Sequence, residues 1–532
     1  MLNKFFLLAF TLKDLKIIQI IHFIFFYLKK KKFKKKNIKI IKKKFIYKKP
    51  FFLKTINRFD YKKKTYNFGN FTKKINLNNW DNKSVNKLWE YNFFYFDFLF
   101  QEKLIINKKI SLYIIEKWIK ISYIKKKHIM WDPYPTSIRL INLVKFCIYN
   151  KINSEYINES IYNHLLHLRD NLEYRLGANH LLTNLIALNC AKFFLEIKDN
   201  KYKKFEKMLH NEINDQFHNN MHYEKTPTYH NTLTEQLIIY GLVKKIYDHK
   251  PDNQFLIFLN KLISTSKNLS HPDGELAFFN DTNYDSLNYK QLELLLKKNF
   301  KIIKKPKYEN NSSYPFLKKK NIFIITKCCG PEPRFNPGHS HADSLSFEVS
   351  INNKRFLINK GISTYEKNDL RFLQRSTESH NTVKINDKNS SAVWSSFRVG
   401  KKSQVFNRKI NKKNYLISAS HNGFSNFIKT ITHNRTWKLK DDYLVINDEI
   451  SGKFKNFKIY FHFSPNVNIF KKNNLVKFQI DKIKGIISFS NANNISIKNT
   501  FFYPKFGIQK RIQSLIVDCD NKNNKTLINF KI

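Results

Sequence analysis

Residues 338–350 carry the side chains best suited to chemistry: Gly-His-Ser-His-Ala-Asp-Ser-Leu-Ser-Phe-Glu-Val-Ser. His339 and His341 lie two residues apart, and imidazoles both transfer protons and bind metals near neutral pH. From residue 345 onward, apolar and polar residues alternate, which predicts a half-buried strand after a turn at 337–338. We therefore expect two imidazoles at the mouth of a strand. Because so short a motif has low specificity, a packing role is the alternative.

Two further segments, 173–180 and 222–230, could supply partners. In the first, we expect Gly177 to end one helix and Asn179 to be the N-cap of the next. His180 would then be a packed first-turn residue. The second segment places Tyr229 in a proline-containing loop with several titratable groups, which suits acid–base work. The alternative for this loop is a polar helix start.

Arginines follow in the C-terminal half. Arg371 and Arg375 precede His380, and guanidinium groups bind carboxylates through two parallel hydrogen bonds. The alternative is that both arginines lie on a solvated face. Segments 271–274 and 279–282 are predicted to be turns that border a cleft.

The composition indicates a folded protein with an unusual charge. Of 532 residues, 42% are hydrophobic, so a large core is possible, and the net charge is +55. Such a charge fits a polyanion or membrane partner, but the lysines are spread along the chain, which favours compositional drift. Five cysteines without CxxC spacing argue against a disulfide framework, and Cys147 and Cys190 are predicted core residues.

Residues 1–60 are apolar and basic. The runs 5–10 and 17–28 are too short to cross a bilayer, and no small-residue cleavage site follows the first run. We expect an N-terminal helix followed by a basic linker, whose lysines at 29–49 could contact an anionic membrane surface or simply be solvated. The periplasm or cell envelope is the expected location, with the cytoplasm as the alternative.

The rest of the chain divides by its hydrophobic period. Helical patterns occupy 88–100, 103–124, 137–149, 155–174, 179–194 and 232–247, and the two prolines of 131–135 are expected to separate helices. Alternating patterns occupy 321–327, 345–351, 354–359, 381–385, 415–420, 443–448, 457–463, 485–490 and 514–518. We therefore predict a basic N-terminal segment (1–60), a helical domain (61–312) and a β-sandwich domain (313–532). Ligand sites favour such domain interfaces.

Six segments, in this order, resemble the heparinase II/III family of polysaccharide lyases, including its alginate lyase branches. They are 131–139 (WDPYPTSIR), 177–184 (GANHLLTN), 222–230 (HYEKTPTYH), 337–347 (PGHSHADSLSF), 375–383 (RSTESHNTV) and 393–398 (VWSSFR). The resemblance implies a multidomain α and β fold, with an N-terminal (α/α) toroid of helical hairpins followed by a C-terminal antiparallel β-sandwich. It also implies cleavage of an acidic, uronate-containing polysaccharide by β-elimination.

That reaction needs a neutralised uronate carboxylate, a base for the C5 proton and an acid for the departing 4-oxygen. By resemblance, Asn179 would be the neutraliser and His180 its assistant or the base. Tyr229 would be base or acid, and His339 would act at the carboxylate or the proton. The implied substrate-binding residues are Arg139, Tyr134, Arg371, Arg375 and Trp394.

No cofactor is required by this chemistry, although some family members carry a structural zinc. The corresponding positions are His341, Asn359 and His380, and an amide is a poor zinc ligand compared with a carboxylate. Two other departures from the family pattern are Phe94, where a histidine is frequent, and Asn219–Asn220, in place of Asp-Gly.

Two other hypotheses remain open. One is an assembly protein that binds or trims a surface glycan without lyase activity. The other is a nucleic-acid or membrane-surface binder driven by charge, but outside 29–49 the sequence shows no concentrated basic segment. We expect an acidic polysaccharide as partner, and neither nucleic acid nor a transmembrane span. The sequence does not predict an oligomeric state.

Overall fold

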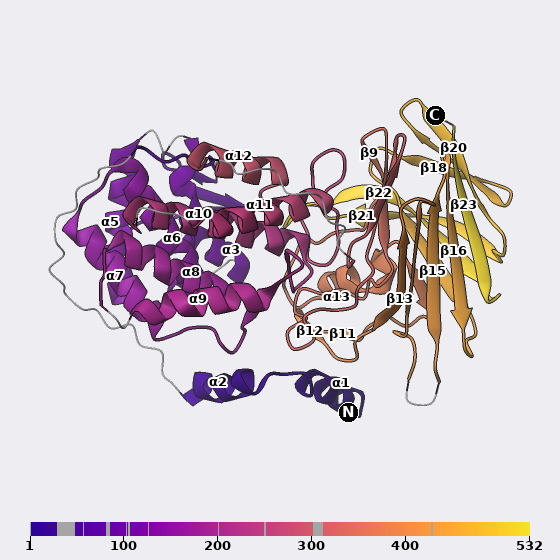
Figure 1. Ribbon diagram of the computed structural model, residues 1–532, viewed down its shortest axis with the longest axis horizontal. Helices are drawn as coiled ribbons and strands as arrows, with labels where there is room; N and C mark the ends of the chain where they lie inside the picture. The colour runs from indigo at the N-terminus through magenta and orange to yellow at the C-terminus, as the bar shows by residue number, and fades with distance from the viewer. Residues whose placement is uncertain are drawn as a thin grey trace.

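The computed structural model describes residues 2–28, 48–56, 58–80, 86–102, 104, 107–125, 127–199, 202–248, 252–301, 312–426 and 429–531. A helical half and a β half lie side by side, and two N-terminal helices run beneath them (Figure 1). The described chain thus has the predicted order of helices first and antiparallel strands second.

The helices are α1 (Leu2–Leu12), α2 (Ile17–Leu28), α3 (Lys87–Phe94), α5 (Lys108–Ile124), α6 (Pro133–Asn150), α7 (Glu155–Arg169), α8 (Ala178–Phe194), α9 (Lys203–Gln216), α10 (Pro227–Asp248), α11 (Asn253–Asn268), α12 (Tyr289–Asn299) and α13 (Asp369–Arg375). Short 3-10 helices span Asp97–Phe100, Ile129–Trp131 and Thr377–Ser379. Helix α8 packs against both α6 and α10, and the apolar faces of the three helices belong to one large core.

The two prolines separate helices α5 and α6, as predicted, whereas a second local prediction was wrong. Pro133 and Pro135 lie in the first turn of α6, where a missing backbone N–H costs nothing, so they begin a helix. Gly177 does not end a helix: α7 stops at Arg169, and Gly177 is the N-cap residue of α8 with φ 61°. Asn179 therefore lies inside the first turn of α8, where its side chain is available for other contacts.

The strands of the described residues form six sheets. The largest has the order β13 (Val405–Asn411), β14 (Leu416–His421), β15 (Thr432–Leu439), β16 (Tyr443–Ser451), β23 (Asn523–Lys531), β20 (Ile483–Phe489), β19 (Leu475–Ile480), β18 (Asn468–Lys472). Two four-stranded sheets are β10 (Val383–Ile385), β17 (Phe457–His462), β22 (Lys510–Cys519), β21 (Asn494–Phe502) and β6 (Phe316–Lys319), β7 (Ile322–Thr326), β8 (Phe347–Ile351), β9 (Lys354–Leu357). The small sheets are β1 (Phe59–Asp60), β2 (Thr65–Phe68), β3 (Phe71–Lys74); β4 (Phe217–His218), β5 (Met221–His222); and β11 (Val393–Trp394), β12 (Arg398–Val399).

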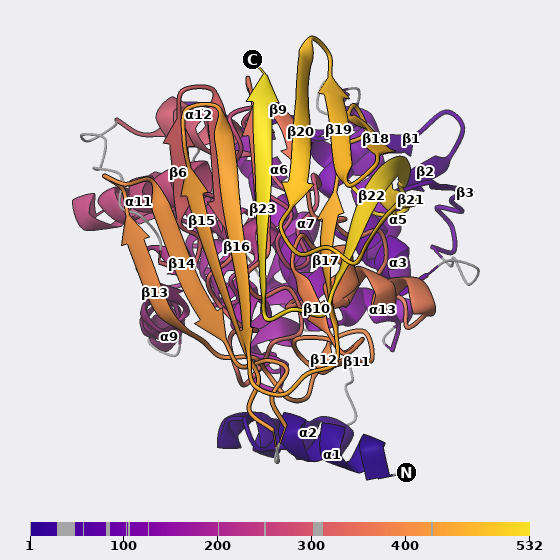
Figure 2. The ribbon, with the colours of Figure 1, turned by 90° about the vertical axis from the view of Figure 1, so that its right-hand side faces the viewer.

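The three large sheets contribute to one hydrophobic core, and all their strand pairs are antiparallel (Figure 2). All nine predicted strand segments overlap an observed strand. Cys147 and Cys190 are buried in the helical core, as predicted, and the five cysteines are free thiols.

Strand β8 is buried on both faces, so the half-buried prediction was wrong. Its polar residues face the helical half, where His271 bonds both Ser350 Oγ (2.6 Å) and Glu348 Oε2 (2.8 Å). Glu348 also accepts from the Phe278 N–H at 3.0 Å, and burial raises its pKa to about 7. These bonds fix the β half against the α11–α12 loop.

The N-terminal segment forms two helices rather than one, and most of the predicted basic linker lies outside the described residues. Among the helices described, none combines the length and apolarity needed to span a bilayer.

Candidate active site

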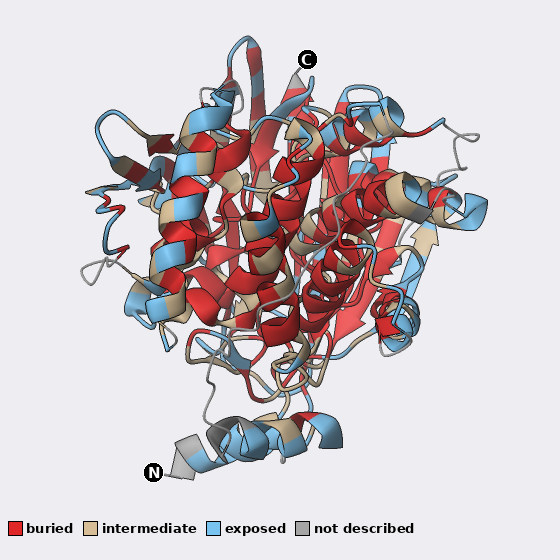
Figure 3. Ribbon diagram, turned by 90° about the vertical axis from the view of Figure 1, so that its left-hand side faces the viewer, coloured by how far each residue is buried: buried red, intermediate tan, exposed pale blue. Residues whose placement is uncertain are grey.

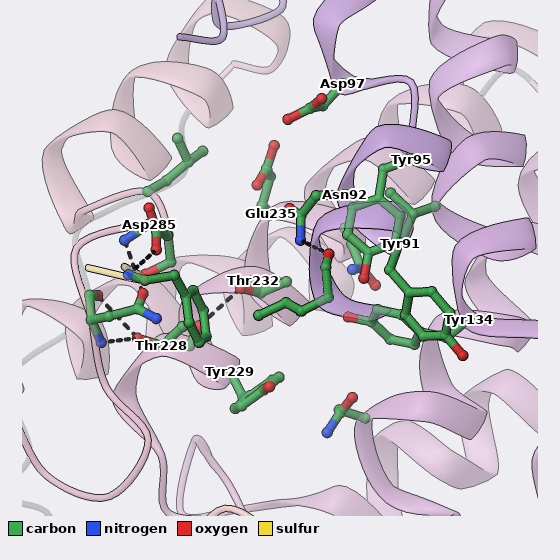
Figure 4. A pocket seen from close by; sticks show the side chains of 18 of the residues that line it. Tyr91, Asn92, Tyr95, Asp97, Tyr134, Thr228, Tyr229, Thr232, Glu235 and Asp285 are labelled. Carbon is green, nitrogen blue, oxygen red and sulfur yellow. Dashed lines mark hydrogen bonds between the residues drawn. The ribbon is translucent and has the colours of Figure 1, made fainter. Parts of the chain in front are cut away.

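A cavity of about 1200 Å³, hereafter the cleft, is lined by both halves of the chain. The helical half contributes Tyr134, Asn179, His180 and Tyr229, and the β half contributes His339, all five named in the sequence predictions. Figure 4 shows Tyr134 and Tyr229 among the polar and aromatic side chains of this cleft. The structure thus brings together all four predicted catalytic residues.

Asp281, fully buried in the α11–α12 loop, is the hub of the β side of the site. Its carboxylate accepts from His339 Nδ1 (2.9 Å) and His341 Nε2 (2.8 Å), and from two nitrogens of Arg371 (2.5 and 2.7 Å). Although burial opposes ionisation, Arg371 and the imidazoles hold the pKa of Asp281 well below its usual range. An ionised Asp281 fixes the proton of His339 on Nδ1, which leaves Nε2 as a proton acceptor.

Tyr229 lies in the first turn of α10 and faces His339, with ring centroids 4.0 Å apart. Its hydroxyl is 3.0 Å from the hydroxyl of Tyr365, which also lines the cleft. Burial and the neighbouring Tyr365 raise the pKa of Tyr229 well above its usual value. The phenol therefore keeps its proton at neutral pH and is suited to act as an acid.

Asn179 is 2% exposed, and its Nδ2 donates to both oxygens of Glu224 at 2.9 and 3.0 Å. Its Oδ1 has no hydrogen-bond partner among the residues that the structure describes. Glu224 is buried and lines the cleft, and burial raises its pKa despite opposing contributions from His339 and Asn179. Glu224 thereby orients the amide of Asn179 toward a ligand.

His180, beside Asn179, packs against Tyr134 with ring centroids 4.5 Å apart. Its Nδ1 is 3.2 Å from a carboxylate oxygen of Glu173. The ring is partly exposed to the cleft, so Tyr134 and His180 form a wall with an aromatic face and a polar edge. Aromatic faces of this kind pack against the apolar faces of ring-shaped ligands.

The other predicted substrate-binding residues do not line the cleft. Arg139 is fully buried and donates to His164 (3.0 Å), Phe94 O and Met130 O, so it holds helices together. Arg371 is bound to Asp281, and Arg375 donates to the carbonyl oxygens of Ser340, Ser395 and Ser396. The Trp394 indole donates to Thr11 Oγ1 at 3.2 Å. In this structure their hydrogen bonds position other parts of the chain.

The residues at the proposed zinc position do not fit a zinc ion. Asn359 Oδ1 accepts from the Asn381 N–H at 3.0 Å, and His341 Nε2 is bound to Asp281. His341 Nδ1 and His380 Nε2 are 3.2 Å apart and can share a proton. Within the described residues, no group of three or more histidine, cysteine or carboxylate side chains could hold a metal. Two imidazoles and an amide are too weak a ligand set.

We expect that replacing Asn359 with aspartate will create zinc affinity. The substitution supplies the missing anionic ligand beside His341 and His380. The Nδ1 atom of His341 and the Nε2 atom of His380 are already 3.2 Å apart. Zinc should then raise the unfolding temperature of Asn359→Asp but not that of the wild type, and metal analysis after dialysis should find zinc only in the variant. Equal zinc content in both proteins would contradict this account.

Three residues of the site were not singled out from the sequence: Asp281, Glu224 and Tyr365. Asp281 lies in a segment predicted to be a turn bordering a cleft, and Glu224 lies in a loop predicted to suit acid–base work, but neither residue was named. Tyr365 follows β9 in a stretch without a motif. The sequence signal that could have identified Glu224 is a carboxylate placed among aromatic and proline residues. For Asp281 the only sequence signal is its position in the tripeptide Asn-Asp-Thr.

The structure thus defines a protein with a helical domain, an antiparallel β domain and a shared cleft lined by amide, phenol and imidazole groups. Residues 304–531 match the model of the family described as Heparinase II/III-like, C-terminal. Over these residues the chain is similar to the heparinase II/III-like family, and most of the chain shares the fold of a solved heparinase.

Solved structures support the fold over most of the chain. A structure of heparinase III has a TM-score of 0.66 and 16% identity, covering 86% of this chain and 79% of its own. The heparan sulfate lyase HepC from Pedobacter heparinus has a TM-score of 0.56 and 16% identity, covering 87% and 80%. Chondroitin AC lyase from Streptomyces coelicolor A3, in complex with chondroitin sulphate, has a TM-score of 0.50 and 8% identity, covering 83% and 74%. A comparison with curated proteins found no match.

Proposed function

We propose that the protein is a polysaccharide lyase that cleaves a uronate-containing polysaccharide by β-elimination in the cleft between its two halves. The observation that carries the proposal is the convergence of Asn179, Tyr229 and His339 on one cavity. The similar structures named as heparan sulfate and chondroitin lyases support it through their fold.

The geometry suits each step of the reaction. Asn179, held by Glu224, donates an N–H to the uronate carboxylate and stabilises the enolate-like charge that forms when C5 loses its proton. His339 Nε2 accepts that proton, because its Nδ1–H is fixed on Asp281. Tyr229 then protonates the 4-oxygen as the glycosidic bond breaks. His180 and Tyr134 bind the neighbouring sugar face.

We expect Glu224→Gln to change the pH dependence of KM. An ionised Glu224 would repel the substrate carboxylate, and burial raises its pKa, so its acid form persists above the ordinary range of glutamate. KM of the wild type should therefore rise as the pH passes upward through the pKa of Glu224, by about tenfold for one nearby buried charge.

The variant should show no such rise, because glutamine cannot ionise but still offers an oxygen to Asn179. His222, His180 and His339 also lie near Glu224, but they are identical in both proteins, so their contributions cancel in the comparison. Parallel KM–pH curves for the two enzymes would rule out this role.

A second candidate function is an assembly protein that binds or trims a surface glycan without elimination. The weakened zinc position favours it, because this chain departs there from the family pattern. Binding of a glycan that persists in Tyr229→Phe and His339→Ala, with no unsaturated product from any of the proteins, would support it over the lyase.

We further propose that the helices form an (α/α) toroid (61–312), that the C-terminal sheets form a β-sandwich (313–532), and that the protein works in the periplasm or cell envelope. The shared core of the three large sheets supports the sandwich. The proposed polyanionic substrate fits the net charge of +55.

A further inference from the structure

We infer that helices α1 and α2, together the N-terminal arm, dock the protein on an anionic membrane surface. The arm lies along one side of the molecule, beneath both halves (Figures 1 and 2). Its burial pattern differs from that of an ordinary surface helix: Gln19 is buried and Asp14 half-buried, whereas most apolar residues between 5 and 25 are exposed to solvent.

The inner side of the arm is tied to both halves by polar contacts. Asp14 pairs with Lys402 (2.8 Å) in the β half, and the Gln19 amide reaches Arg175 O (3.5 Å) in the helical half. His22 stacks on Tyr174 with ring centroids 4.6 Å apart. Gln19 is 5% exposed. The orientation of the arm is therefore set by specific partners.

The outer side is apolar and open. Eleven of the twenty-two exposed large hydrophobic side chains in the described structure lie between Phe5 and Phe25. Phe5 is 70% exposed, Ile17 75% and Phe25 57%, and the arm is largely pale blue in Figure 3. Scattered exposed apolar residues are ordinary, but a contiguous apolar face marks an interaction surface.

The charge of the segment selects the partner. The first 49 residues contain sixteen lysines and one acidic residue, Asp14, which is paired inward with Lys402. Apolar side chains on helices followed by a dense lysine run are the sequence signature of binding to anionic lipid surfaces. Nucleic acid would satisfy the lysines but leave the apolar face in water.

The length of the arm favours lying on the membrane rather than crossing it. Helix α2 has 12 residues, or about 18 Å at the α-helical rise, against roughly 30 Å for the bilayer core. Because the inner contacts involve both halves, docking would hold the entire two-domain body at the lipid surface.

Vesicle flotation with the full chain tests the inference. The probes are vesicles of phosphatidylcholine alone and of equal parts phosphatidylcholine and phosphatidylglycerol. The arm variant is Ile17→Ser/Ile24→Ser/Phe25→Ser. The matched control is Phe71→Ser/Ile257→Ser/Phe470→Ser, which removes three exposed apolar side chains elsewhere. Unfolding temperatures verify that all three proteins are folded.

We expect the wild type and the control to float with the mixed vesicles and to bind phosphatidylcholine at least tenfold more weakly. The arm variant should bind the mixed vesicles at least tenfold more weakly than the wild type, since three apolar anchors are lost. Equal binding of the mixed vesicles by the arm variant and the wild type would overturn the inference. A wild type that binds neither kind of vesicle would overturn it as well. A lipid-free dimer that the arm variant converts to monomer would also overturn it, because a second copy would then cover this face.

Discussion

Replacing Tyr229 with phenylalanine is expected to lower kcat by about a thousandfold, within the usual range for loss of a general acid. The substitution removes one oxygen atom and keeps the ring that packs against His339 at 4.0 Å. Substrate binding should persist, so KM should change little. Steady-state kinetics on a cleaved uronate polymer, followed through the unsaturated product, would measure both constants.

Tyr365→Phe is the matched control for this experiment. It deletes the Tyr365 hydroxyl, which lies 3.0 Å from the Tyr229 hydroxyl, and leaves the hydroxyl of Tyr229 in place as the proton donor. A loss of about tenfold or less is expected, because only the orientation of Tyr229 is relaxed. If both variants lost activity equally, the acid role would not belong to Tyr229 in particular.

Asp281→Asn should have the largest combined effect on stability and activity. Asp281 is the buried counter-charge of Arg371 and the acceptor for two imidazoles. Removing one partner of a buried ion pair costs about 3 to 5 kcal/mol. The amide would also meet guanidinium donors with its own N–H groups, and the proton of His339 would no longer be fixed on Nδ1. We expect kcat to fall by about a thousandfold as well.

The pH dependence of this effect has a defined sign. The pKa of Asp281 is held well below its usual range, so its stabilising contribution is present above the ordinary aspartate pKa and is lost only in stronger acid. Denaturant unfolding should therefore show a large deficit for Asp281→Asn at neutral pH that shrinks as the pH falls below about 4.

Asp273→Asn provides the control. Asp273 also pairs with an arginine, Arg355 at 2.7 Å, but its side chain is 32% exposed and lies outside the cleft lining. Its loss should cost less than the loss of Asp281, because Asp273 is partly exposed, and it should leave kcat unchanged. A stability loss in Asp281→Asn no greater than that of Asp273→Asn would refute the hub role.

The order of the architecture was predictable because the hydrophobic period changes from that of helices to that of strands near residue 314. The four proposed catalytic residues were found through motifs around Asn179, Tyr229 and His339, and the structure places them on one cleft. Local spacing cannot reveal which side chains meet across the domain junction. Asp281 illustrates this limit, because its partners His339 and Arg371 lie 58 and 90 residues away in sequence.

The failures have the same origin. Arg139 lies in a family motif, but its guanidinium donates hydrogen bonds to backbone carbonyls of neighbouring segments and does not reach the cleft. The polar positions of β8 are buried because the α11–α12 loop covers the face that the sequence pattern assigned to solvent. Asn179 was predicted to cap a helix, whereas Gly177, with its positive φ, is the N-cap residue of α8 and leaves the Asn179 amide free to bond Glu224.

The central claim is tested most directly by incubating the purified protein with a panel of uronate polysaccharides, including alginate, heparan sulfate and chondroitin sulfate, and following ultraviolet absorbance. The proposal predicts that absorbance rises, from the 4,5-unsaturated product, with at least one polymer. This rise should be lost in Asn179→Ala, which removes the amide that is held by Glu224 and donates to the substrate carboxylate. Folded wild-type protein that produces no absorbance gain with any member of the panel would contradict it.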